Sequence, residues 1–250
     1  MNDATKPPAT ERFHWQLNGK IVLFVVVFLP LTIGLGFWQL SRGEQKQALM
    51  DEFERRQAAA PVAVDSLRED DRQYVRVAAR GSFDNDRSIL LDNRIRQGRA
   101  GYEVVTPFEA TPSGTWLLVN RGWIAAGPTR DQLPAIPSVG GEVAISGYLY
   151  QSPDKPFTLG EEQWREHWPQ VLQNLDAEAL AGRLGVALDG YSLRLDDSAP
   201  GALRVGWELI NIQPEKHTAY AVQWFALAVA LVVLALFANS NLGALLRRRR

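Results

Sequence analysis

The sequence predicts an integral membrane protein of the α+β class. Two transmembrane helices flank a mostly β extracytoplasmic domain, expected to be a small barrel or sandwich with one or two short helices. Two long uncharged apolar stretches, one near each end of the 250-residue chain, predict the helices. Between them, short runs of β-favouring residues are separated by turn residues, which predicts the β domain. The chain contains no cysteine, so no disulfide stabilises that domain.

The first predicted transmembrane helix covers residues 21–41, which carry no charge. Its length suits a hydrocarbon core of about 30 Å, and membrane helices tolerate its internal Pro30. The apolar run is too long for a typical signal peptide, so we interpret it as an uncleaved anchor. Residues 42–60 are expected to continue as a helical extension, because the pair Asp51 and Arg55 has i,i+4 spacing.

The second predicted transmembrane helix covers residues 217–240 and is followed by a basic tail, 241–250, that ends in four arginines. Basic residues favour the cytoplasmic side of a membrane. The tails 1–20 and 241–250 are therefore predicted to be cytoplasmic, and residues 61–216 to form a periplasmic domain. Because no Arg- and Ser-rich transit peptide is evident, we expect a two-pass protein of the bacterial inner membrane.

The predicted domain alternates strands and turns. Residues 111–114, with proline at the second position, favour a hairpin turn, and Asp176–Leu184 is expected to be a helix that stops at Gly185. The predicted strands are residues 74–81, 88–93, 101–110, 114–126, 141–150, 190–195 and 203–210.

Composition excludes several classes of function. The termini hold seven of the 27 basic and two of the 28 acidic residues, which leaves residues 42–216 with 20 basic and 26 acidic ones. That balance argues against nucleic-acid binding. The absence of cysteine excludes zinc–cysteine sites, and two methionines offer little soft sulfur for copper, so neither zinc nor copper is expected. No nucleophile–base motif is evident, so we do not expect an enzyme.

Three residues around the end of the first predicted helix are candidates for anchoring or docking, and one residue of the predicted domain is a candidate for ligand binding. Trp38, Arg42 and Lys46 share one helix face, which is typical of interfacial anchoring but also suits docking of a partner. Arg121 ends a predicted strand in the run VNRGW. It is either part of a structural ion pair or an exposed guanidinium that binds ligand carboxylates.

The start of the second helix combines polar and aromatic side chains. Helical spacing places on one face the residues His217, Tyr220, Ala221, Trp224 and Ala228. The two alanines leave room either for a flat ring or for close helix approach. Gln223 lies on another face and should seek a polar partner at this shallow depth. A neutral imidazole is a standard axial ligand of haem iron, so His217 indicates either a haem site or interfacial anchoring with helix packing.

The chain resembles the surfeit locus protein 1 family of cytochrome c oxidase assembly factors. The resemblance covers nearly its whole length, with the two-helix topology. It is carried, in order, by LGFWQLSRGEQK, YVRVAARGSFDN, GYEVVTPFEA, LLVNRGWI and HTAYAVQWFALA.

The resemblance implies a non-catalytic role in the maturation of haem–copper oxidases, with haem a bound transiently as cargo. By this likeness His217 is the candidate iron ligand, Tyr220 and Trp224 contact the haem or a partner, and Arg121 suits the haem carboxylates. Trp38, Arg42 and Gln223 are candidates for anchoring or partner contact. The implied partners are cytochrome c oxidase subunit I and haem A synthase. The alternative is a cofactor-free membrane scaffold that stabilises an oxidase assembly intermediate.

Overall fold

The computed structural model describes residues 12–67, 72–129, 132–152, 164–207 and 213–247. The chain forms two compact units. We call Met1–Asp51 with Ile210–Arg250 the helical unit, and Glu52–Leu209 the β unit. Most of the predicted N-terminal tail, the last three arginines and the end of the strand predicted for 203–210 lie outside the described residues.

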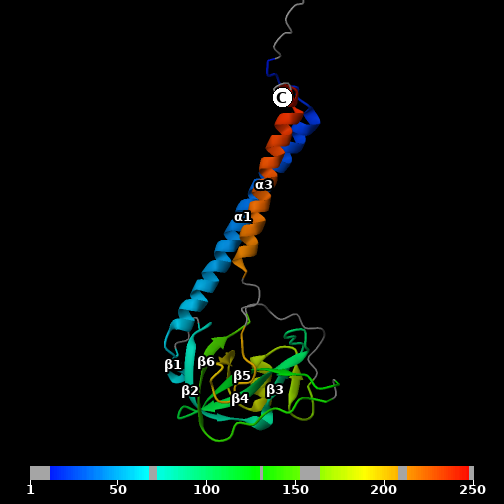
Figure 1. Ribbon diagram of the computed structural model, residues 1–250. Coiled ribbons are helices and arrows are strands. Elements are labelled where there is room, and N and C mark those ends of the chain that lie inside the picture. Colours follow the sequence, from blue (N-terminus) through cyan, green and yellow to red (C-terminus); the bar gives the residue numbers. More distant parts are fainter. Residues whose placement is uncertain (1–11, 68–71, 130–131, 153–163, 208–212, 248–250) are drawn as a thin grey trace, which may run out of the picture. The chain divides into compact units, whose positions relative to one another are not determined.

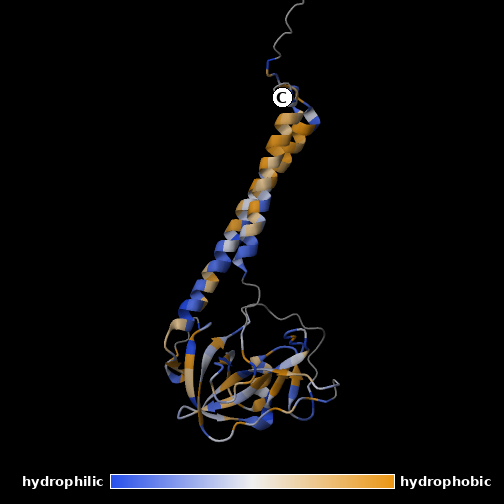
Figure 2. Cartoon of the chain, in the orientation of Figure 1, coloured by the Kyte–Doolittle hydropathy of each residue, from blue (hydrophilic) through white to orange (hydrophobic). Residues whose placement is uncertain are grey.

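The helical unit is built on two long helices that lie side by side (Figure 1). Helix α1 (Gly19–Ala58) has 40 residues, of which those from Glu52 onward belong to the β unit. Helix α3 (Pro214–Ala238) has 25 residues, and a short α4 (Leu242–Arg247) follows it. By length and composition, α1 and α3 can each cross a membrane. Figure 2 shows α1 turning from hydrophobic to hydrophilic toward its C-terminal end.

The seam between α1 and α3 consists of small residues. Gly36 and Gly43 on α1 are buried at a seven-residue spacing. Pro214, Ala221 and Ala228 on α3 are also buried and seven residues apart. A seven-residue repeat keeps one stripe of each helix facing its partner, as in coiled coils. Small residues in that stripe allow the backbones to approach closely, which is how membrane helices associate.

A cluster of polar contacts joins the chain before α1 to the chain after α3. The Asn239 side-chain oxygen accepts from the Asn18 amide at 2.7 Å, and that of Asn241 accepts from the His14 amide at 3.0 Å. Trp15 forms an isolated β-bridge with Ser240. These bonds satisfy backbone amides of the segment that leads into α1.

The β unit contains one sheet that closes on itself. Its order is β1-β2-β6-β8-β5-β4-β3-β7, and β2 also pairs with β4, so that β2, β6, β8, β5 and β4 form a closed ring. β5 and β8 are parallel, whereas the other neighbours in the ring are antiparallel. The strands are β1 (Val62–Ala63), β2 (Arg76–Phe83), β3 (Ile89–Leu91), β4 (Gly101–Ala110), β5 (Thr115–Ala125), β6 (Val143–Tyr150), β7 (Gln170–Leu172) and β8 (Leu188–Leu195).

Three apolar clusters are found among the described residues of the β unit, and the two largest stabilise this barrel from both sides of β4. One gathers side chains from the ring strands, among them Val77, Phe108, Ile145 and Leu193. The other includes Leu180 of helix α2 (Ala177–Leu184) and side chains from β3, β4, β5 and β7. Because these two clusters take side chains from both faces of β4, that strand is buried along nearly its whole length.

The predicted fold class is confirmed: two long apolar helices flank a mostly β domain that contains a small barrel. Helix α2 is also confirmed, with Asp176 as its N-cap and Gly185 as a left-handed C-cap. The strand predicted for 203–210 is wrong over its described part. There Arg204 forms only an isolated bridge to Trp123, and Gly206 has a φ of 117° that interrupts extended backbone. The short strands β1 and β7 were not predicted.

Candidate functional site

His217 lies in the first turns of α3 and contacts α1 directly. Its Nδ1 is 2.7 Å from Oε1 of Gln39. An amide oxygen only accepts, so Nδ1 donates, and in the neutral ring the other nitrogen, Nε2, carries the lone pair. The hydrogen bond to Gln39 thus orients the partly buried ring and selects one tautomer of the neutral imidazole. This is the arrangement in which a histidine is ready to ligate a metal, with its outer hydrogen bond already made.

The seam explains why these two side chains meet. Gln39 lies between the buried Gly36 and Gly43, so it faces α3. A Cβ added at Gly43 would lie 3.5 Å from Cβ of His217, an ordinary contact, whereas one at Gly36 would lie 2.6 Å from the Phe225 ring. Glycine at position 36 is therefore what lets Phe225 pack against α1 at this level.

The seam also decides between the two uses proposed for the small residues of α3. Ala221 is 1% exposed and Ala228 6% exposed. Both are buried in the helical unit, so they serve close helix approach and leave no slot for a flat ring between the helices at the level of these two alanines. Any apolar ligand of His217 must lie on the outer side of the helix pair.

Other predicted residues of this region lie mostly outside the seam. Tyr220 is 52% exposed, and Trp224 is partly buried. Gln223 is exposed, and no hydrogen bond of its side chain is found within the described part of the chain. On α1, the guanidinium carbon of Arg42 lies 5.9 Å from the centre of the exposed Trp38 ring, an arrangement suited to an interface.

Arg121 is not the exposed cation that the sequence allowed. It is 1% exposed and belongs to the β unit. Its Nε donates to the Gly201 carbonyl at 2.8 Å, and its Nη2 donates to the Pro137 carbonyl at 2.7 Å. Burial lowers the pKa of its guanidinium. The exposed alternative is therefore wrong, because the side chain ties two loops to β5, and it does so through backbone carbonyls and not through an ion pair among the described residues.

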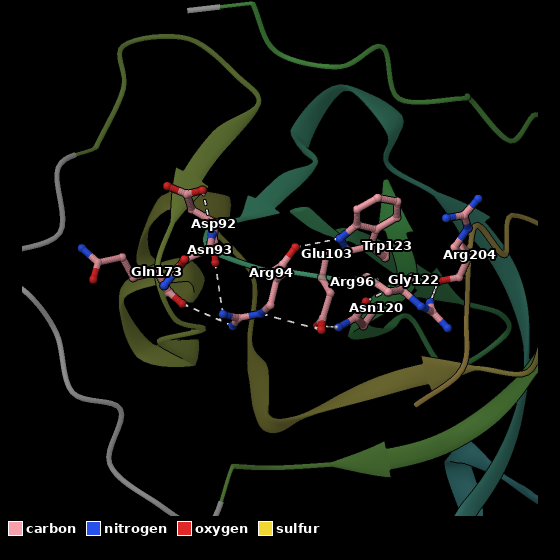
Figure 3. A network of polar contacts seen from close by, with 10 residues as sticks. All are labelled: Asp92, Asn93, Arg94, Arg96, Glu103, Asn120, Gly122, Trp123, Gln173 and Arg204. Atoms are coloured by element: carbon pink, nitrogen blue, oxygen red, sulfur yellow. Dashed lines mark hydrogen bonds and ion pairs between the residues drawn. The ribbon is translucent and has the colours of Figure 1, made fainter. Parts of the chain in front are cut away.

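The rest of the VNRGW run takes part in a polar network (Figure 3). The buried Asn120 donates to Oε2 of Glu103 at 2.7 Å, and its own side-chain oxygen accepts from the Gly122 amide. Arg94 forms an ion pair with Glu103 at 3.7 Å and accepts at its carbonyl from the Trp123 indole at 2.8 Å. The network holds the loop after β3 against a bulge between β4 and β5.

Glycine is required at the centre of this bulge. Gly122 has a φ of 109°, and a Cβ there would lie 2.9 Å from the Arg204 carbonyl oxygen. Arg204 in turn places its guanidinium carbon 5.3 Å from the centre of the Trp123 ring. The run therefore fixes the segment around Arg204 to the end of β5.

Comparison with known proteins gives the family. A sequence model described as the SURF1 family matches residues 26–229, most of the chain. The chain belongs to the SURF1 family. The match includes both Gln39 and His217, and it includes the polar network of the β unit.

Curated relatives agree with this SURF1 assignment. Surfeit locus protein 1 of Homo sapiens is 28% identical over 232 residues, which cover 85% of this chain and 76% of that protein. Surfeit locus protein 1 of Takifugu rubripes is 26% identical over 83% of this chain and 92% of its own length. An uncharacterised SURF1-like protein of Mycobacterium bovis is 27% identical over 92% of this chain and 84% of its own.

The sequence predicted one residue of the hydrogen-bonded pair in this SURF1 chain, His217, but not its partner, Gln39. His217 stood out because it opens an apolar stretch. Gln39 was quoted only as part of a motif, although it is an uncharged polar residue near the end of a membrane helix, which is a signal for a partner. Glu103 was missed because a single acidic residue in a strand carries no pattern of its own.

Proposed function

We propose that this chain is a membrane-anchored assembly factor for haem–copper cytochrome c oxidase, which binds haem a at His217 and assists its insertion into the large oxidase subunit. Membership of a family known for cytochrome oxidase assembly supports the general role. The single observation that carries the finer proposal is the hydrogen bond from His217 to Gln39, because it leaves Nε2 free to bind iron.

The surroundings of His217 suit a large, planar, apolar cargo. The seam is closed at Ala221 and Ala228, so the cargo would lie on the outer, lipid-facing side of α3. There the exposed Tyr220 and the partly exposed Trp224 offer ring contacts one and two turns along the helix. Haem iron accepts a neutral imidazole, and the acidic tails of haem remain near water at the start of the helix.

A carrier must also release its cargo, and Gln39 fits that need. A carboxylate as hydrogen-bond partner makes an imidazole more basic and a stronger ligand. Gln39 is a neutral amide, so it orients the ring without strengthening the bond to iron as much. Cytochrome c oxidase subunit I is the proposed acceptor of the haem, and haem A synthase the proposed donor.

The same proposal assigns topology. The basic tails would lie in the cytoplasm and the β unit in the periplasm of a bacterium, with both α1 and α3 in the inner membrane. Arg42 and Trp38 would then lie as anchors at the periplasmic surface of the inner membrane. Fusing a reporter after Arg250 tests this assignment, since an extracytoplasmic reporter would place His217 at the wrong membrane face.

The decisive experiment uses the histidines of the chain, which number three. The full chain is purified in detergent from cells that make haem a, and its Soret band is recorded. We expect His217→Ala to lose the band, whereas the control substitutions His14→Ala and His167→Ala keep it. A His217→Ala protein with an unchanged band would rule out the ligand assignment.

One observation favours the cofactor-free scaffold. The bond to Gln39 gives one nitrogen of His217 a role in joining α3 to α1, so iron is not needed to explain why the residue is there. A scaffold would purify colourless even where haem a is abundant, and His217→Ala would then leave oxidase assembly intact. Oxidase activity of membranes from a strain carrying His217→Ala separates the two functions.

A further inference from the structure

A row of three polar side chains crosses the outer face of the barrel. Arg76 on β2 lies opposite Tyr148 on β6, and Tyr148 lies opposite Arg194 on β8. Side chains alternate between the two faces of a strand. The neighbours of the row, Val77 and Leu193, point into the barrel core, so the row points outward.

Aromatic side chains cover this row. The Arg194 guanidinium carbon lies 3.5 Å from the centre of the Tyr150 ring and 5.0 Å from the centre of the Trp207 ring. Tyr74 packs near Tyr148 and Tyr150, with ring centres 6.3 and 6.2 Å away. As a result Tyr148 is only 4% exposed and Arg194 only 9% exposed.

The covered row contains hydrogen-bond donors without acceptors. Within the described part of the chain, five buried side-chain atoms have no hydrogen-bond partner, and three of them belong to this row. They are Nε of Arg76, the hydroxyl of Tyr148 and Nε of Arg194. Each can donate a hydrogen bond. Buried polar groups are almost always paired, so a concentration of unpaired donors calls for an acceptor that is supplied from outside the chain, either an ordered water or an anion.

The charge of the row is not balanced. Arg76 forms an ion pair with Asp196, which also accepts from Ser146. Among the described residues, no carboxylate lies within ion-pair distance of Arg194. The row therefore carries one positive charge more than its neighbours neutralise, in surroundings largely shielded from water. An anion placed there would gain both hydrogen bonds and charge compensation.

We propose that the row Arg76–Tyr148–Arg194 is a binding site for an oxyanion, namely a phosphate group. A phosphate has enough acceptor oxygens to meet donors from three strands at once, and guanidinium groups match its geometry. The site is in the β unit and does not depend on haem binding at His217. Its phosphate can come from a soluble compound or from a lipid headgroup.

The test measures thermal unfolding of the full chain in bilayer discs of neutral lipid, at matched ionic strength, with inorganic phosphate or chloride. We expect phosphate at about ten times its dissociation constant to raise the unfolding midpoint by about 3 °C. Arg194→Gln should abolish the shift, and Tyr148→Phe, which keeps the ring packing, should reduce it. Arg80→Gln is the control, because Arg80 lies on β2, the strand that carries Arg76, but is exposed and paired with Glu142.

A second arm replaces inorganic phosphate by discs that contain phosphatidylglycerol. If these discs raise the unfolding midpoint of the unsubstituted chain but not that of Arg194→Gln, the site binds a lipid headgroup. If only inorganic phosphate raises the midpoint, the site binds a soluble phosphate. The proposal is overturned if neither source shifts the midpoint, or if Arg194→Gln and Tyr148→Phe respond as the unsubstituted chain does.

Discussion

The helical unit and the β unit both bury polar side chains among apolar ones, but they leave those side chains in different states. In the helical unit, His217 makes one hydrogen bond to Gln39 and keeps a nitrogen lone pair and partial exposure. In the β unit, Arg121 is fully enclosed and its guanidinium holds two loop carbonyls. The first arrangement leaves a coordinating atom available to a ligand, whereas the second uses the side chain for structure.

This difference shows that burial alone does not identify a functional residue. What separates the two is whether the remaining bonding capacity can be reached from outside, because Nη1 of Arg121 also has no partner but lies in a side chain that is only 1% exposed. Nε2 of His217 points away from Gln39, because the two ring nitrogens lie on opposite sides of the imidazole. The carbonyls of Gly201 and Pro137 instead depend on Arg121 for their hydrogen bonds.

The largest expected effect is on the stability of the β unit and comes from Arg121, the structural residue of this comparison. Arg121→Met keeps much of the side-chain volume but leaves the Gly201 and Pro137 carbonyls without a donor. We expect it to lower the free energy of unfolding of the β unit by about 3 kcal/mol. Urea unfolding followed by tryptophan fluorescence measures this, with the exposed Arg80→Met as control. Equal stability of both variants would mean that Arg121 is free to serve a ligand.

A smaller effect is expected in the seam, where two glycines give a matched pair. An alanine at Gly36 would place its Cβ 2.6 Å from the Phe225 ring, whereas one at Gly43 would meet His217 at an ordinary 3.5 Å. We expect Gly36→Ala to destabilise the helix pair by about 2 kcal/mol and Gly43→Ala by much less. The chain lacks cysteine, so one cysteine introduced on each helix carries a fluorophore pair that reports helix separation.

Whether a feature depends on neighbouring or on distant residues explains which features could be predicted from the sequence. Long apolar stretches and the caps Asp176 and Gly185 are local signals, and they gave the helices correctly. The bond between His217 and Gln39 joins residues 178 positions apart, so only the packed seam reveals it. The strand predicted for 203–210 had a suitable local pattern, but Gly206 and the single bridge to Trp123 prevent a ladder from continuing over its described part.

Substitutions at Gln39 test the functional residue of the comparison, His217, and their expected effect rests on haem binding there. Gln39→Leu removes the acceptor that orients the imidazole, so we expect haem a affinity to fall about tenfold. Gln39→Glu supplies a carboxylate acceptor and should slow haem release. Both are measured by transfer of haem from the purified protein to apomyoglobin. Unchanged transfer in both variants would reduce Gln39 to a packing residue.

The smallest expected effect is at the ion pair of the polar network. Glu103 and Arg94 are 3.7 Å apart, with side chains 21% and 34% exposed, so water screens their attraction. Glu103→Gln should therefore cost less than about 1 kcal/mol in urea unfolding. Asn120→Ala should cost more, because it removes a buried side chain that bonds both to Glu103 and to the Gly122 amide. The reverse order would mean that charge, and not the buried amide, holds the β4–β5 bulge. The β unit would then resemble the helical unit in depending on one polar pair.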